Sequence, residues 1–412
     1  MRRHLPPALH IREFARLWAA ILSMRFADHM VAVAVGWQVY ALHRNPLDLG
    51  LIGLMEFLPL PLLALPAGQL ADRAPRRAVL AFSLGMSVAV VTGLLLVTLH
   101  GATELWPFLA LAGATGVSNA IGWPAYGALT PEVVPPDLLP GAMALRSVAG
   151  QIAVVAGPAL GGLLFALRPE TVYAVAMALF AVALAAVVSL KTRTLANDGE
   201  RAAPGFADLI AGVRFVMRTR MLLGAIALDL FAVLFGGAVA LLPVYARSIL
   251  HTGPVGLGVL RSAPAVGALS AAVILTRRPL RPRAGPTLLV VVALFGAATV
   301  VFGFSRWLPL SLAALAVAGF VDMISVNIRS TTVALVTPNE LRGRVNAVEM
   351  VFISASNELG AFESGLVASL VGTVTAVVAG GVATIAIALS WTKLFPALSR
   401  MGRLEDLQPE PV

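Results

Sequence analysis

The chain has 412 residues, of which 58% are hydrophobic and only 12% are charged, and its mean hydropathy is +0.88. Because soluble domains carry about 25% charged residues, this composition excludes a water-soluble fold. The absence of cysteine excludes disulfides, thiolate metal sites and cysteine nucleophiles. The net charge of +9 fits the basic cytoplasmic loops of a membrane protein better than nucleic-acid binding.

Polar and turn-rich breaks divide the chain into apolar stretches long enough to cross a bilayer, which takes about 20 residues each. These breaks predict an all-α membrane protein with twelve transmembrane helices. The expected spans are 14–41, 47–71, 78–99, 105–129, 140–165, 170–190, 221–246, 254–276, 286–305, 309–336, 345–371 and 374–395.

Lysine and arginine are distributed unevenly between the loops. The even-numbered loops and the two tails hold 22 of the 30 basic residues, whereas the odd-numbered loops hold four. Basic residues favour the cytoplasmic side, so both termini are expected in the cytoplasm. The remaining four lie inside spans: Arg25, Arg146, Arg261 and Arg329.

The longest polar stretch, 191–220, separates an N-terminal half (1–190) from a C-terminal half (221–412). Its second part, FADLIAGVRFVMRTR, has the pattern of an amphipathic helix on the inner membrane surface. The halves also resemble each other: at an offset of 205, Val39-Tyr40-Ala41 aligns with Val244-Tyr245-Ala246. We therefore expect two pseudo-symmetric six-helix halves, an architecture of secondary transporters.

Ionisable residues inside the spans are the main candidates for binding and coupling. Each costs roughly 2.5–3.5 kcal/mol in the centre of a bilayer and so normally faces a partner or an aqueous pathway. The candidates for proton coupling or substrate binding are Asp28, Glu56, Asp322, Glu358, Arg25, Arg329, Glu363, Asp229 and Arg261. Asp28 and Glu358 rank first, followed by Glu56 and Asp322. The alternative role for each is an ion pair between helices.

Several of these candidates share a helical face. Arg25, Asp28 and His29 have i, i+3, i+4 spacing, and Asp322 and Arg329 are seven residues apart. Among the aromatic residues, Trp37 and Trp123 are candidates for stacking on a substrate ring. Tyr40 and Tyr126, near span ends, fit interfacial anchors.

The loop after the second expected span has the ordered pattern G-x-L-A-D-R-x-x-R-R. It contains Gly68, Asp72, Arg73, Arg76 and Arg77. The pattern resembles the loop 2–3 signature of the major facilitator superfamily, with a proline where glycine is usual. The resemblance implies a cytoplasmic gate in which the pairing of Asp72 with these arginines changes during transport. The corresponding loop of the second half, 277–283, has no acidic residue.

The fifth expected span contains Gly157, Pro158, Gly161 and Gly162 in the order G-P-x-x-G-G. Small residues allow close helix contact and proline bends a helix, so packing alone is a sufficient explanation. The string also resembles the motif of antiporters in the superfamily, although the upstream glycines of that motif are replaced by alanine.

Three longer segments resemble the enterobactin exporter branch of the superfamily. They are RFADHM with GWQVY and LIGLMEFLP, then SVNIR with RGRV and SNELGAFESG, and finally WTKLFPAL. The resemblance implies proton-driven export of a siderophore or a similar small organic solute across the bacterial inner membrane.

These observations predict a secondary efflux transporter, proton-coupled and working by alternating access, without a cofactor or metal. Its expected partners are a small organic solute, protons and the lipid bilayer, and it is expected to be a monomer. The sequence contains no nucleotide-binding P-loop and no hydrolase motif, so neither ATP nor enzymatic catalysis is expected. The alternatives are a broad-specificity exporter of drugs and toxic compounds and, in a different class, a non-transporting membrane receptor or scaffold.

Overall fold

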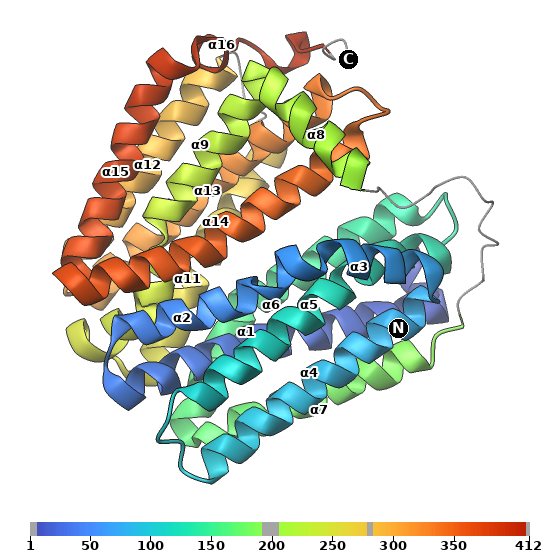
Figure 1. The fold of residues 1–412 in the computed structure, drawn as a ribbon, viewed down its shortest axis with the longest axis vertical. Helices are drawn as coiled ribbons and strands as arrows, with labels where there is room; N and C mark the ends of the chain where they lie inside the picture. The colour runs from blue at the N-terminus through green and yellow to red at the C-terminus, as the bar shows by residue number, and fades with distance from the viewer. Residues whose placement is uncertain (1–5, 192–205, 278–282, 409–412) are drawn as a thin grey trace. The chain divides into compact units, whose positions relative to one another are not determined.

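The computed structural model describes residues 6–191, 206–277 and 283–408, with side chains except at 64–65, 68–69, 71–73 and 206–209. Within these ranges the chain consists of helices and short connections, with no strand. It divides into two compact units (Figure 1). The first comprises Met1–His43, Met55–Ala203 and Gly253–Ser262, and the second Arg44–Leu54, Pro204–Thr252 and Ala263–Val412. Helices α2 and α11 are thereby shared between the units.

The first half of the chain forms seven α-helices after a short 3-10 turn. Their bounds are Arg12–His43 (α1), Pro46–Phe57 (α2), Pro59–Arg73 (α3), Arg76–Leu99 (α4), Trp106–Val133 (α5), Leu139–Leu167 (α6) and Pro169–Val188 (α7). Helix α1 packs on α6 and α7, α4 packs on α5 and α7, and α3 packs on α5. A buried polar chain joins α1, α4 and α7: Tyr173 donates to Gln38 (2.8 Å), and the Gln38 amide donates to Thr98 (3.1 Å).

The second half repeats this order after the amphipathic segment. Its helices are Phe206–Arg218 (α8), Arg220–Gly236 (α9), Leu242–Val244 (α10), Gly253–Arg277 (α11), Ala284–Phe304 (α12), Leu308–Val336 (α13), Arg342–Val371 (α14), Thr373–Leu394 (α15) and Pro396–Ser399 (α16). Helix α9 packs on α14 and α15, and α12 packs on α13 and α15, as Figure 1 shows. Helices α11 and α13 meet closely, because a methyl group on Gly319 would lie only 2.0 Å from the Pro264 carbonyl oxygen.

The helix pairings confirm the internal repeat expected from the sequence. In each half the first span packs on the fifth and sixth, the third on the fourth and sixth, and the second on the fourth. Duplicated apolar patterns produce duplicated helix contacts because the same helix faces are buried in both halves.

Ten helical segments within the described residues are long and apolar enough to cross a membrane. They coincide with ten of the twelve expected spans. The other two expected spans correspond to α5 (28 residues) and α14 (30 residues), which are equally long but more polar. Helix α14 contains three glutamates and two arginines, which lower its hydropathy.

Two expected spans are not continuous α-helices. The second is divided into α2 and α3 at Pro59, whose missing N–H group cannot continue the hydrogen-bond ladder. The seventh ends as α-helix at Gly236 and continues through a 3-10 turn, α10 and a π-helical turn, Tyr245–Ile249, with Pro243 inside the irregular part.

Helix α8 is present where an amphipathic helix was expected. Its apolar residues Phe215 and Val216 are buried against Val333 and Val345 of the second unit, whereas Met217 is exposed. Packing on α13 and α14 therefore accounts for much of its apolar face. Its position on the inner membrane surface remains a prediction.

Candidate functional site

Arg25, in the middle of α1, faces two aromatic rings of α5. Its guanidinium carbon lies 5.0 Å from the centre of the Trp123 ring and 5.4 Å from that of Tyr126. The two rings are three residues apart on one helical face, with centroids 5.9 Å apart. These distances are those of cation–π contacts.

A second arginine approaches the same aromatic pair from α6. The guanidinium of Arg146 lies 4.4 Å from the Tyr126 ring centre and donates hydrogen bonds to the Thr130 hydroxyl (2.7 Å) and the Gly127 carbonyl (3.4 Å). We call Arg25, Trp123, Tyr126 and Arg146 the arginine–aromatic cluster. Sequence analysis noted Arg146 inside a span but did not rank it as a site residue, because no spacing rule relates α6 to α5.

Asp28 and His29 lie one turn beyond Arg25 on α1. Asp28 is within electrostatic reach of Arg25, and His29 of both Arg25 and Arg261. Arg261 of α11 donates a hydrogen bond to the Ala32 carbonyl of α1 (3.0 Å). Three of the predicted candidates, Arg25, Asp28 and Arg261, therefore lie together with His29 around one stretch of α1.

Glu56 lies near the end of α2 with its side chain half-buried. Its main-chain carbonyl is in close contact with α5, where a methyl group on Gly116 would lie 2.3 Å from the oxygen. This contact fixes the backbone at Glu56 through helix packing.

In the second unit, Asp229 of α9 and Arg329 of α13 form a buried ion pair. Only 12% of the Asp229 side chain and 5% of the Arg329 side chain are exposed. Glu349 of α14 lies within electrostatic reach of Arg329. These contacts support the structural alternative, a bond between helices, for Asp229 and Arg329.

Asp322 lies two turns before Arg329 on α13 and is half-buried. Within the described part of the chain it makes no hydrogen bond and no ion pair. Glu358, by contrast, packs against the second half of α2, where a methyl group on Gly53 would lie 3.3 Å from its Oε2. Glu363 accepts a long hydrogen bond from Ser364 (3.5 Å).

The loop signature is described only in part, because the side chains of Gly68, Asp72 and Arg73 lie outside the described residues. Arg76 forms an ion pair with Glu132 at the end of α5 (2.8 Å). Arg77 donates a hydrogen bond to the Leu190 carbonyl just beyond α7. Both arginines therefore connect the start of α4 to the ends of other helices of the same unit.

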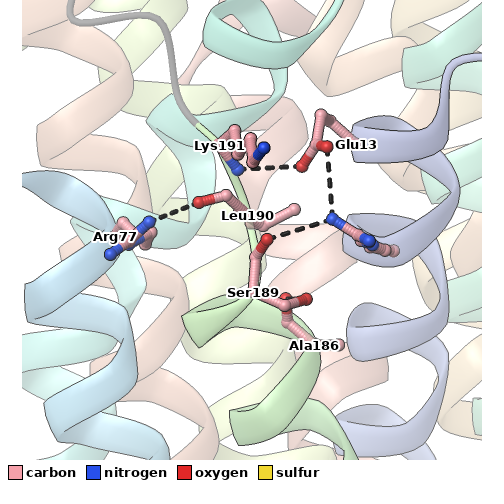
Figure 2. Close-up of polar contacts among 7 residues, drawn as sticks. Glu13, Arg77, Ala186, Ser189, Leu190 and Lys191 are labelled. Atoms are coloured by element: carbon pink, nitrogen blue, oxygen red, sulfur yellow. Dashed lines mark hydrogen bonds and ion pairs between the residues drawn. The ribbon is translucent and has the colours of Figure 1, made fainter.

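The end of α7 is also held by the start of α1, as Figure 2 shows. Glu13 accepts a hydrogen bond from the Lys191 backbone N–H (2.9 Å) and pairs with Arg16 (3.2 Å). Arg16 in turn donates to the Ser189 carbonyl (3.0 Å). Arginines at these carbonyls complement the negative end of the helix dipole.

The G-P-x-x-G-G string of α6 lies at close helix contacts. A methyl group on Gly161 would lie 2.8 Å from the Met30 Cα of α1, and one on Gly162 would lie 2.4 Å from the Pro254 carbonyl oxygen of α11. Helix α6 continues through Pro158. Close packing of α6 on α1 and α11 is the structural role that these glycines have in this structure.

These side chains offer two kinds of chemistry in the two units. The arginine–aromatic cluster presents cations and ring faces, whereas Asp322 presents a carboxyl group with no fixed partner among the described residues. No group of three or more His, Asp or Glu within the described ranges is arranged to hold a metal ion.

A family model described as a transmembrane secretion effector matches residues 5–408. The chain is 28% identical over 367 residues to the multidrug efflux pump Tap of Mycobacterium tuberculosis, covering 85% of this chain and 86% of Tap. It is 27% identical over 403 residues to the enterobactin exporter EntS of Citrobacter koseri, covering 97% of this chain and 93% of EntS.

Solved structures of transporters have the same fold. A bacterial homologue of the human lysosomal transporter Spinster, in an inward-facing and unoccupied conformation, has a TM-score of 0.74 with 15% identity and covers 99% of this chain and all of its own. The nucleoside transporter NupG has a TM-score of 0.69 with 12% identity, covering 93% and 99% of the two chains.

Proposed function

Because this chain belongs to the transmembrane secretion effector family of the major facilitator superfamily, we propose that it exports a small organic solute by alternating access, driven by protons moving inward. The family comprises multi-pass membrane transporters, and its relatives here include efflux proteins. We place the protein in the bacterial inner membrane with both termini in the cytoplasm, as the distribution of basic residues favours.

The observation that carries the coupling part is the state of Asp322. It is half-buried in a membrane-spanning helix and makes no hydrogen bond or ion pair within the described part of the chain. A carboxyl group without a fixed partner gains and loses a proton without breaking a structural contact, which is what a proton carrier must do. We therefore rank Asp322 first, because Asp28 lies in the field of Arg25 and Asp229 is held by Arg329.

Other acidic residues keep their proposed roles at lower rank. Glu56, Glu358 and Glu363 remain candidates for coupling or substrate binding, since each has a half-buried side chain in a membrane-spanning helix. Asp72 is proposed as the acidic member of the cytoplasmic gate, with Arg73 beside it. Arg76 and Arg77 support this proposal by positioning the start of α4.

Coupling is tested with purified protein in proteoliposomes, measuring both exchange and gradient-driven movement of a fluorescent solute that the wild type transports. Replacing Asp322 by asparagine should abolish accumulation of this solute driven by a pH gradient while leaving its exchange without a gradient intact. The matched control is Asp137→Asn in the exposed α5–α6 connection, which should retain both activities. Normal gradient-driven accumulation by Asp322→Asn would overturn the assignment.

The substrate class is tested in a deletion strain. If a siderophore is exported, iron-starved mutant cells should release less iron-chelating activity and retain more of it inside, and the intact gene should restore release. If the protein is instead a broad drug exporter, siderophore release should be unchanged and the mutant should become more sensitive to dyes and antibiotics. No change in either assay would contradict export and favour a receptor or scaffold.

A further inference from the structure

We propose that the arginine–aromatic cluster is a binding site for the anionic aromatic part of the transported solute. This inference rests on the proposed export function and assigns the class of substrate: a planar ring carrying a carboxylate or another acidic group. The four residues come from three helices of the first unit, α1, α5 and α6.

The charge of the cluster points to an anion. Arg25 and Arg146 approach the same Tyr126 ring, at 5.4 and 4.4 Å, and neither forms an ion pair within the described part of the chain. Two like charges around one ring repel each other, and a bound carboxylate would relieve that repulsion while accepting charge-assisted hydrogen bonds. Arginine suits this role because its planar donors match the two oxygens of a carboxylate.

The neighbouring titratable groups leave the cluster positive. Asp28 and His29 are the ionisable residues near Arg25 on α1, and of the two only Asp28 is acidic. Arg146 has polar but neutral partners, the Thr130 hydroxyl and the Gly127 carbonyl. On α1, Asp28 is therefore the acidic side chain that opposes the Arg25 guanidinium.

The surfaces of the rings supply the second part of the recognition. Trp123 is 44% exposed, so part of its indole surface is left uncovered for contact with a ligand ring. The pair is positioned by Pro124, which follows Trp123 inside α5 and removes one hydrogen bond of the helix. Charged groups in spans avoid lipid, so the face that carries both arginines belongs to an aqueous pathway.

The other embedded arginines are less suited to this role. Arg329 is held by Asp229, and Arg261 donates to the Ala32 carbonyl of α1. The Arg25 guanidinium, by comparison, makes ring contacts and no hydrogen bond within the described residues. Its donors are available to a ligand.

The test is equilibrium binding by titration calorimetry of the purified full-length protein with three probes that share one ring system: 2-naphthoate, neutral 2-naphthamide and cationic 2-naphthyltrimethylammonium. We expect the wild type to bind naphthoate in preference to the other two. Arg25→Gln and Arg146→Gln should each weaken naphthoate binding by about tenfold, the loss of one charge-assisted hydrogen bond. Arg25→Lys should have a smaller effect, and Trp123→Leu should weaken binding of all three probes.

The matched control is Arg168→Gln at the exposed end of α6, which should leave naphthoate binding unchanged. Asp28→Asn should strengthen binding, because it removes an acidic group that competes with the ligand for Arg25. Such a gain in affinity cannot arise from misfolding. Equal or tighter binding of the ammonium probe, or unchanged naphthoate binding in both glutamine variants, would overturn the proposal. If the binding proposal fails but the protein exports cationic dyes, the proposed export function still stands. If the protein binds naphthoate but exports no solute, the proposed export function is refuted and only an anion-binding site remains.

Discussion

Replacing Asp229 by asparagine should destabilise the protein by about 3 kcal/mol, because it leaves Arg329 buried without its ion-pair partner. Only 5% of the arginine side chain is exposed, so water cannot take over the role of the carboxylate. The lower end of the usual range of about 3–5 kcal/mol applies, since Glu349 still lies within electrostatic reach. The free energy of unfolding can be measured by titration with a denaturing detergent in mixed micelles.

A double-mutant cycle isolates the contribution of the pair. The cycle consists of Asp229→Leu, Arg329→Met and the variant with both changes, and the double variant should cost less than Asp229→Asn, because two apolar side chains leave no charge unpaired. The exposed Asp137→Asn variant serves as the control for removing a negative charge and should change stability by less than about 0.5 kcal/mol. A loss below about 1 kcal/mol for Asp229→Asn, or strictly additive effects in the cycle, would refute the reasoning.

Three further changes test the helix contacts, each by the same unfolding measurement. Gly161→Ala should cost about 1–3 kcal/mol, because the added methyl meets the α1 backbone at 2.8 Å, whereas Gly150→Ala on the same helix meets nothing within 4 Å and should be neutral or gain up to about 1 kcal/mol. Trp391→Phe should cost about 1–3 kcal/mol, because it removes the buried hydrogen bond from the indole to a carbonyl of α9 (2.9 Å). The control Trp307→Phe, at a side chain that is 66% exposed, should leave the free energy of unfolding unchanged. Arg77→Gln should cost about 1.5 kcal/mol through the lost charge-assisted bond at the end of α7, and an unchanged stability would contradict that role.

The fate of the individual ionisable residues shows how far sequence reasoning reached. Helical spacing correctly placed Asp28 and His29 near Arg25, since positions three and four apart share a face. It did not distinguish Asp229, which has an ion-pair partner, from Asp322, which has none in the described residues. Each is the single carboxyl group of an apolar helix. Only the contact with a neighbouring helix determines which of the two has an ion-pair partner.

The loop signature illustrates the same limit. The resemblance implied that Asp72 pairs with the arginines, and this stays a prediction because the Asp72 side chain lies outside the described residues. Arg76 pairs with the carboxylate of Glu132 on α5, which the pattern did not indicate. The acceptor for Arg77 is instead a backbone carbonyl beyond α7, as Figure 2 shows. Since every residue carries such a carbonyl, no pattern of side chains reveals which one an arginine reaches.

The sequence by itself determined the class of protein, ten of the spans by their hydropathy, and the repeat between the halves, because burial in lipid demands long apolar helices and duplicated sequence packs in the same way. It also indicated the family, through motifs that occupy a few adjacent positions. Tertiary structure alone decided that Arg146 and Arg25 both approach the Tyr126 ring and that Arg329 forms an ion pair with Asp229. Those contacts join helices far apart in the chain, and their geometry depends on how side chains of neighbouring helices interlock rather than on any local spacing.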